Sequence, residues 1–203
     1  MRGFLPPRSS CISKVICSLT CYTTYLIFIL TREIRGLPIV EGVDPVGRIL
    51  YCSIALEKLA AEVYRELAAR LSTRNPALLL EVLSTESEAH AKILEKLAEA
   101  IEVELRPAQC REVVGYAYEN LEEIKALLKS GDTASATLEL LLSKLSLVEI
   151  SSEETYHKIL LPLLKVIAST TGVAEVLEKI AKDESYHEEL LELIRRAVLG
   201  GSS

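Results

Sequence analysis

Apolar residues recur at the spacing of an α-helix over almost all of the chain from residue 44 onward. Breaker segments divide this pattern into long helices expected at about 44–72, 76–104, 133–166 and 171–198, with a connector helix at 107–129. Asp44 and Pro45 are typical of a helix start, whereas Pro162 predicts a kink or an early end. There is no strand pattern of any length, so the sequence predicts an all-α bundle.

Each of the four long helices carries an ionisable side chain inside its apolar stripe. Burying such a group costs free energy unless it is paired or bound to a ligand. A single one has an ordinary explanation, such as a hydrogen-bonded core histidine. Four helices that each place one near mid-length indicate that these side chains meet. The residues are Glu57, His90, Glu149, Glu184 and His187.

The two halves of this region repeat the same pattern. Glu57 is followed seven residues later by Tyr64, and Glu149 is followed seven residues later by Tyr156. Seven residues are about two helical turns, so each pair shares one face of its helix. The segments "STESEAHAKILEKL" (84–97) and "AKDESYHEELLELI" (181–194) align on their histidines. Each half therefore pairs a Glu/Tyr helix with an acid/His helix.

Over about residues 45–198 this pattern resembles the ferritin-like superfamily, and within it the rubrerythrin-like di-iron proteins. The resemblance implies a ferritin-like four-helix bundle at 44–199, with an extra helix in the crossover connection. It implies that Tyr64 and Tyr156 are catalytic tyrosines that orient ligands and hydrogen-bond carboxylates around them. The metal ligands that it implies are Glu57 and His90 for one ion, Glu149 and His187 for the other, Glu184 as a bridge, and Glu86.

One position departs from the family pattern. The residue three before His90 is Ser87, where the family has a glutamate that bridges the two metals. Glu86 lies four residues before His90, shares a helix face with it, and is the candidate to substitute for the missing glutamate. The alternative is a site that lacks this bridge and binds metal weakly, at one position, or not at all.

The function that the resemblance implies is reduction of peroxide or O2 by two iron ions, or by iron and manganese. The chain has no C-x-x-C pair for a rubredoxin-like or zinc-ribbon site, so an external electron donor is expected. Two alternatives stay open, an iron-oxidising storage protein and a bundle with a degenerate site that is structural or an interaction module. Bundles of this kind often form homo-oligomers. The net charge of −6 argues against nucleic-acid binding.

Residues 1–40 form an atypical N-terminal segment. Residues 15–30 carry no charge and follow Arg2, Arg8 and Lys14, which is typical of an uncleaved membrane anchor, although the run is short for a full span. The other interpretation is a start codon assigned too far upstream, with the true start near 37–43. We expect a cytoplasmic protein, or a membrane-anchored one if the segment is genuine.

Two of the five cysteines, Cys52 and Cys110, lie in the helical region. We expect both to be small buried or half-buried residues in a reducing compartment.

Overall fold

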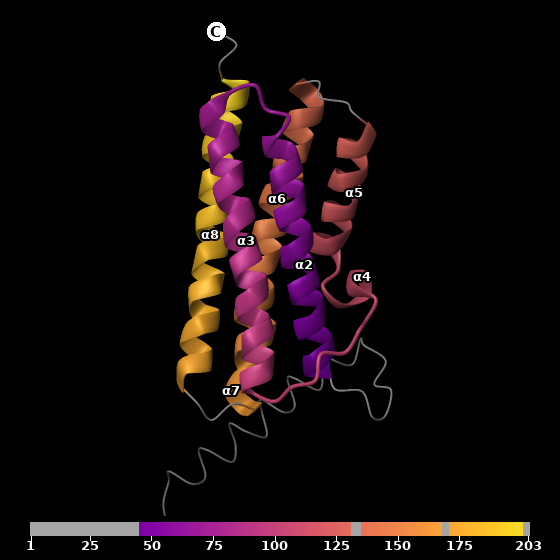
Figure 1. Ribbon diagram of the computed structural model, residues 1–203, viewed down its shortest axis with the longest axis vertical. Coiled ribbons are helices and arrows are strands. Elements are labelled where there is room, and N and C mark those ends of the chain that lie inside the picture. Colours follow the sequence, from indigo (N-terminus) through magenta and orange to yellow (C-terminus); the bar gives the residue numbers. More distant parts are fainter. Residues whose placement is uncertain (1–44, 131–134, 168–170, 201–203) are drawn as a thin grey trace, which may run out of the picture. The chain divides into compact units, whose positions relative to one another are not determined.

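The computed structural model describes residues 45–130, 135–167 and 171–200, and the long helices among them run side by side as a bundle (Figure 1). The four long helices are α2 (Pro45–Ala68), α3 (Arg74–Ala100), α6 (Ser135–Thr155) and α8 (Thr171–Leu199). Helix α2 packs chiefly on α3, and α6 packs chiefly on α8. The described residues contain no strand, which confirms the predicted all-α four-helix bundle.

The chain divides after Val43 into two units, and the second, Asp44–Ser203, carries all of these helices. The predicted N-terminal segment, with its uncharged run at 15–30, therefore lies outside the described residues. Within the described part of the chain, no helix is both long enough and apolar enough to span a membrane.

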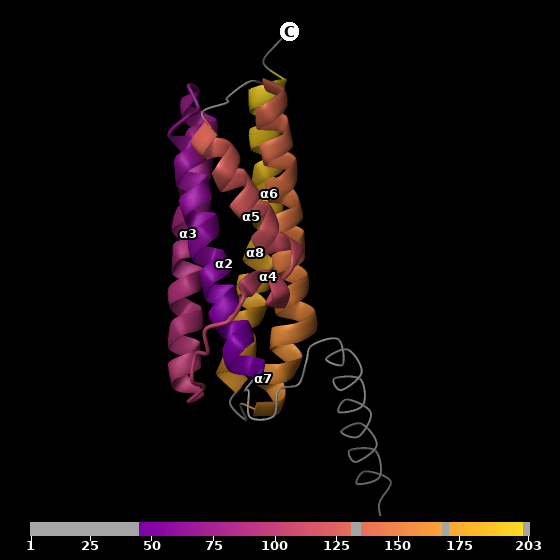
Figure 2. The same cartoon turned by 90° about the vertical axis from the view of Figure 1, so that its right-hand side faces the viewer.

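The crossover between the two helical pairs contains two helices, where the sequence predicted a single connector at 107–129. These are α4 (Cys110–Val113) and α5 (Tyr116–Ser130). Gly115 separates them with a φ of +55°, a left-handed conformation that glycine adopts without steric cost. Helix α5 packs against α2 and α6 (Figure 2) and buries Leu121, Ile124 and Leu128 against them.

Pro162 does not end the helix that contains it. A π-helical turn at Tyr156–Leu160 follows α6, and the chain continues as α7 (Leu161–Ile167). The N–H of Leu161 donates to the carbonyl oxygen of Tyr156, five residues earlier. A proline ring clashes with the carbonyl four residues before it, and here that residue lies within the widened turn. The turn thus accommodates the proline and begins at one of the two predicted catalytic tyrosines.

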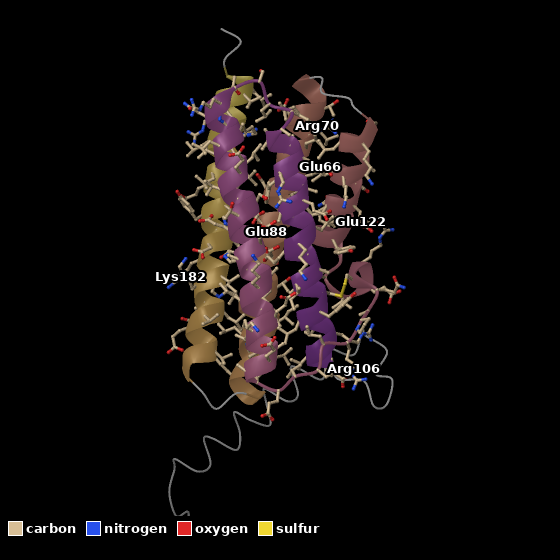
Figure 3. The ribbon with its side chains drawn as sticks, in the orientation of Figure 1. Glu66, Arg70, Glu88, Arg106, Glu122 and Lys182 are labelled. Carbon is tan, nitrogen blue, oxygen red and sulfur yellow. A yellow bond between two sulfur atoms is a disulfide. The ribbon has the colours of Figure 1, made fainter. Side chains whose placement is uncertain are left out.

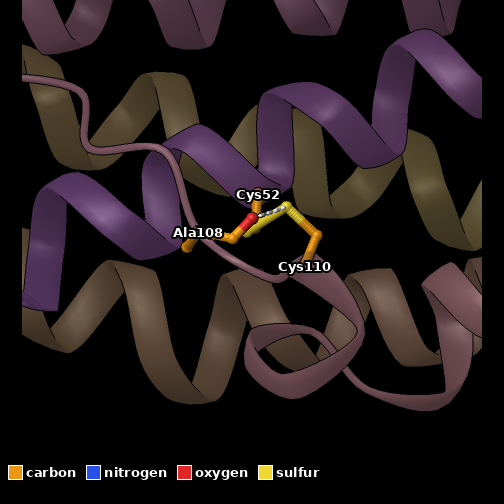
Figure 4. Close-up of a disulfide and its surroundings, with 3 residues drawn as sticks. All are labelled: Cys52, Ala108 and Cys110. Carbon is orange, nitrogen blue, oxygen red and sulfur yellow. Dashed lines mark hydrogen bonds between the residues drawn. A yellow bond between two sulfur atoms is a disulfide. The ribbon is translucent and has the colours of Figure 1, made fainter.

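Cys52 and Cys110 form a disulfide between α2 and α4, which corrects the prediction of two unpaired thiols (Figure 4). Their sulfur–sulfur bond is also visible beside α4 in Figure 3. The bridge joins residues that are 58 positions apart in the sequence and fixes the beginning of the crossover against α2.

The buried apolar side chains form two clusters. One contains Leu56, Val63, Leu83 and Leu145 and fills the part of the bundle near the α2–α3 turn. The other contains Leu50, Leu94 and Leu177 and fills the opposite part. The charged side chains labelled in Figure 3 lie on the outside of the bundle. Between the clusters, along each long helix, lie the buried polar residues Glu57, Ser87, His90, Glu149, Ser152, Glu184 and His187.

Candidate metal centre

Five of the six predicted metal ligands meet in the core of the bundle. Each comes from the middle of a long helix, and none is more than 3% exposed to solvent. Because the repeated sequence pattern places them on the inner stripe of each helix, packing the four stripes together brings them to one level. These residues are Glu57 on α2, His90 on α3, Glu149 on α6, and Glu184 and His187 on α8.

The five side chains form two groups that share Glu184. Glu57, His90 and Glu184 make one group, in which one ligand atom from each residue lies within 4.8 Å of the others. Glu149, Glu184 and His187 make the second group by the same criterion. Glu184 Oε1 lies 2.9 Å from Nδ1 of His90 and 3.9 Å from Nδ1 of His187. One carboxylate therefore stands between the two imidazoles.

Two atoms of this cluster lack a hydrogen bond among the described residues, although both are buried. They are Nδ1 of His90 and Oε1 of Glu184, and their 2.9 Å separation does not have the geometry of a hydrogen bond. Buried polar atoms without partners are rare because they lose the hydrogen bonds that water would give them. Imidazole nitrogen and carboxylate oxygen are donors that suit iron or manganese. The residues present therefore fit a pair of divalent metal ions.

Tyr64 and Tyr156 connect the two helical pairs. The hydroxyl of Tyr64 on α2 donates to Oε1 of Glu149, and the hydroxyl of Tyr156 donates to Oε1 of Glu57. We expected these tyrosines to bond carboxylates around the ligands, but they bond the candidate ligands themselves. Burial, and then the neighbouring carboxylates, raise the pKa of both phenols well above 10.0. Both therefore keep the proton that they donate.

Glu86 lies outside both groups of candidate ligands. Its Oε2 is 3.0 Å from Nε2 of His187, the ring nitrogen that faces away from Glu184. Asp183 stands in the same relation to the other histidine, with Oδ2 3.3 Å from Nε2 of His90. Each acid precedes the histidine of its own helix by four residues and contacts the histidine of the opposite helix. The structure thus places Glu86 against the outer nitrogen of a histidine, away from the position of a bridge.

The alignment of the two halves explains this placement. When His90 is aligned with His187, Glu86 corresponds to Asp183 and Ser87 corresponds to Glu184. Ser87 is buried, and its hydroxyl lies close enough to the carboxyl group of Glu57 to lower the pKa of that group. A short hydroxyl therefore stands where the repeat would place a second bridging glutamate. The same alignment could have identified Asp183, which our sequence analysis missed.

Burial moves the pKa of two of the three central carboxyl groups upward, whereas the pKa of the third is lowered. Burial, and then the charge of Glu149, raise the pKa of Glu57 from 4.5 to about 8. Burial, and then Glu57 and Glu149, raise the pKa of Glu184 well above its ordinary value. Burial acts on Glu149 in the same direction, but the hydrogen bond and the charge of His187 outweigh it, so the pKa of Glu149 is lowered.

The pKa values of the two imidazoles are shifted in opposite directions. Burial opposes protonation of His187, but its hydrogen bond with Glu149 and the surrounding carboxylates raise its pKa. Burial, and then the nearby charge of His187, lower the pKa of His90. The centre without metal is therefore organised around one ion pair, in which Nδ1 of His187 lies 3.2 Å from Oε2 of Glu149. Metal binding has to displace the protons on these groups.

Comparison with known proteins gives one positive result. The searches of curated proteins and of solved structures found no match. The model of the Rubrerythrin family matches residues 48–195, a stretch that contains every residue of the candidate centre. The buried Glu/His cluster and the helical bundle agree with this match. The chain belongs to the rubrerythrin family.

Proposed function

We propose that this protein is a di-metal carboxylate oxidoreductase that reduces peroxide or O2 with electrons from a separate donor. The observation that carries the proposal is the pair of three-residue groups that share Glu184, with two buried ligand atoms that lack hydrogen-bond partners in the described part of the chain. The membership of the rubrerythrin family supports the same chemistry.

Two iron ions, or iron with manganese, would supply the electrons for this reduction. Glu57 and His90 would hold one ion and Glu149 and His187 the other, with Glu184 between them. The described side chains supply the setting for this chemistry. The hydroxyls of Tyr64 and Tyr156 each hold one oxygen of Glu149 and Glu57, respectively. The two apolar clusters exclude water on both sides of the candidate ligands.

One observation favours a second candidate function. Ser87 occupies the position of a bridging glutamate and lies beside Glu57. This substitution favours a helical bundle that binds no metal pair and serves as a structural or interaction module. The two candidates differ in metal content, which can be measured directly.

The test is elemental analysis of the full-length protein produced with iron and manganese available, together with its absorption spectrum before and after addition of peroxide. We expect about two metal equivalents per chain, and we expect peroxide to change the spectrum. His187→Ala should lose metal, whereas His157→Ala, a change of the exposed histidine that follows α6, should retain it. A folded wild-type protein with one equivalent or none would refute the di-metal proposal.

A further inference from the structure

Both ends of the disulfide are buried, and the end at Cys110 also lines a cavity. Cys52, in the middle of α2, has no exposed surface, whereas Cys110, the first residue of α4, is 6% exposed. A cavity of about 410 Å³ lies beside Cys110, which is one of its lining residues, and Cys52 does not line it. Arg111 and Glu112 also line the cavity and are exposed to solvent, so a small molecule can enter it from outside.

Of the two bridged cysteines, Cys110 lines this cavity and Cys52 does not, so a nucleophile that enters it approaches the bridge from the side of Cys110. In thiol–disulfide exchange, a thiolate attacks one sulfur, forms a new disulfide with it and releases the other sulfur as a thiolate. Attack on Cys110 would release Cys52. A second thiol then attacks the mixed disulfide and releases the Cys110 thiolate. Two external thiols thereby become one external disulfide, and the two electrons they lose reduce the protein bridge to two thiols.

The surroundings of Cys110 can accommodate the reduced form. Its sulfur lies 3.7 Å from the carbonyl oxygen of Ala108, the contact drawn as a dashed line in Figure 4. A disulfide sulfur carries no proton, so this is a van der Waals contact while the bridge is closed. A thiol at Cys110 could donate to the same oxygen. Release of Cys52 leaves a small side chain in an apolar cluster, which cysteine tolerates well.

The charges around the cavity select among thiols. Its lining carries one cation, Arg111, and two carboxylates, Glu112 and Glu122. Arg111 pairs with Glu122, at 2.8 Å between Nη2 and Oε2. The lining therefore has a net negative charge, which disfavours an anionic thiol such as glutathione and favours an uncharged or cationic one.

We propose that Cys52–Cys110 is a thiol-exchange site that small uncharged or cationic thiols open by attack on Cys110 through this cavity. The site is separate from the metal centre and does not depend on the proposed oxidoreductase activity. Opening removes the covalent link between α4 and α2, the helix that carries Glu57, while the helical bundle stays folded.

The test uses the full-length folded protein with cysteamine or glutathione in excess, quenched with an alkylating reagent at intervals. Peptide mass spectrometry then locates the mixed disulfide and separates it from adducts on the N-terminal cysteines. We expect the adduct on Cys110, at a rate that rises in proportion to thiol concentration. At low ionic strength, cysteamine thiolate should react about tenfold faster than glutathione thiolate, and this ratio of rates should fall in high salt. Glu112→Gln should lower the ratio of the two rates, whereas Glu81→Gln, an exposed change on α3, should not.

Exchange through the native cavity is distinguished from exchange after unfolding by repeating the reaction in 1 M urea. We expect the rate to change by less than about twofold, because urea strongly favours only states that expose much additional surface. A rate that rises about tenfold or more in urea, an adduct on Cys52, or equal reactivity of the two thiols would each overturn the proposal.

Discussion

Burial of the Glu57 carboxyl group should cost the metal-free protein stability as the pH rises from about 5 to 8. Burial raises the pKa of Glu57 from 4.5 to about 8. Between these values, the folded protein holds a proton that the unfolded chain has released. Rising pH then favours the unfolded chain, and each pH unit in this interval lowers the free energy of unfolding by about 1.4 kcal/mol.

Glu57→Gln should remove this loss. Glutamine has the shape of the protonated carboxyl group and still offers an oxygen to the hydroxyl of Tyr156. At pH 7 the metal-free variant should therefore be more stable than the wild type by about 3 kcal/mol, whereas near pH 4.5 the two should unfold alike. Stability at neutral pH would thus increase when a candidate ligand is removed.

The assay is guanidinium unfolding in the presence of a chelator at several pH values between 5 and 8. Glu66→Gln, on the outside of α2 (Figure 3), is the matched control and should change the free energy of unfolding by less than about 0.5 kcal/mol. A difference between wild type and Glu57→Gln that does not vary with pH would refute the reasoning. So would a variant that is less stable at every pH, because Glu57 would then be ionised and paired in the folded state.

Two further substitutions test the contacts around the centre. Glu86→Gln should weaken metal binding about 10- to 100-fold in a competition titration with a chelator, because the outer nitrogen of His187 loses its carboxylate; unchanged affinity would show that this contact does not support the ligand. Tyr156→Phe should lower the free energy of unfolding of the metal-free protein by about 1–3 kcal/mol, because Glu57 loses a buried donor. Guanidinium unfolding measures this, and an unchanged midpoint would contradict it.

The sequence predicted the bundle because all four long helices show the same pattern of apolar and ionisable residues. Their apolar stripes have the helical period, and the same stripes hold the ionisable residues that need partners. Local backbone features were less predictable. The widened turn before Pro162 and the left-handed Gly115 each change the chain over a few residues and leave the hydrophobic period almost unchanged.

The position of Glu86 shows where helix geometry alone is insufficient. Adjacent residues on an α-helix point about 100° apart, so Glu86 and Ser87 cannot occupy the same place in the core. Sharing a face with His90 brings Glu86 to the correct side of α3 but does not say which group on α8 it will meet. Glu86 meets Nε2 of His187, and this contact depends on how α3 and α8 pack together.

The disulfide was unpredictable for a similar reason. Cys52 lies on a helix whose direction the hydrophobic period defines, but Cys110 lies in the crossover, where the predicted continuous helix was wrong. A separation of 58 residues has no characteristic spacing that marks a bridge. Only the packing of α4 against α2 brings the two sulfurs together.

Side-chain contacts at the centre connect the α2–α3 pair with the α6–α8 pair, and they explain why the centre and the fold depend on each other. Glu57 receives its hydrogen bond from the tyrosine of the second helical pair, and Glu149 receives one from the tyrosine of the first. The outer nitrogen of each histidine likewise contacts an acid from the other pair. Neither α2–α3 nor α6–α8 therefore satisfies all of its buried polar groups by itself, and part of the cost of burying them is offset only when the two pairs dock. A sequence that repeats the same polar residues on both pairs thus specifies the docking of the pairs as well as the ligands between them.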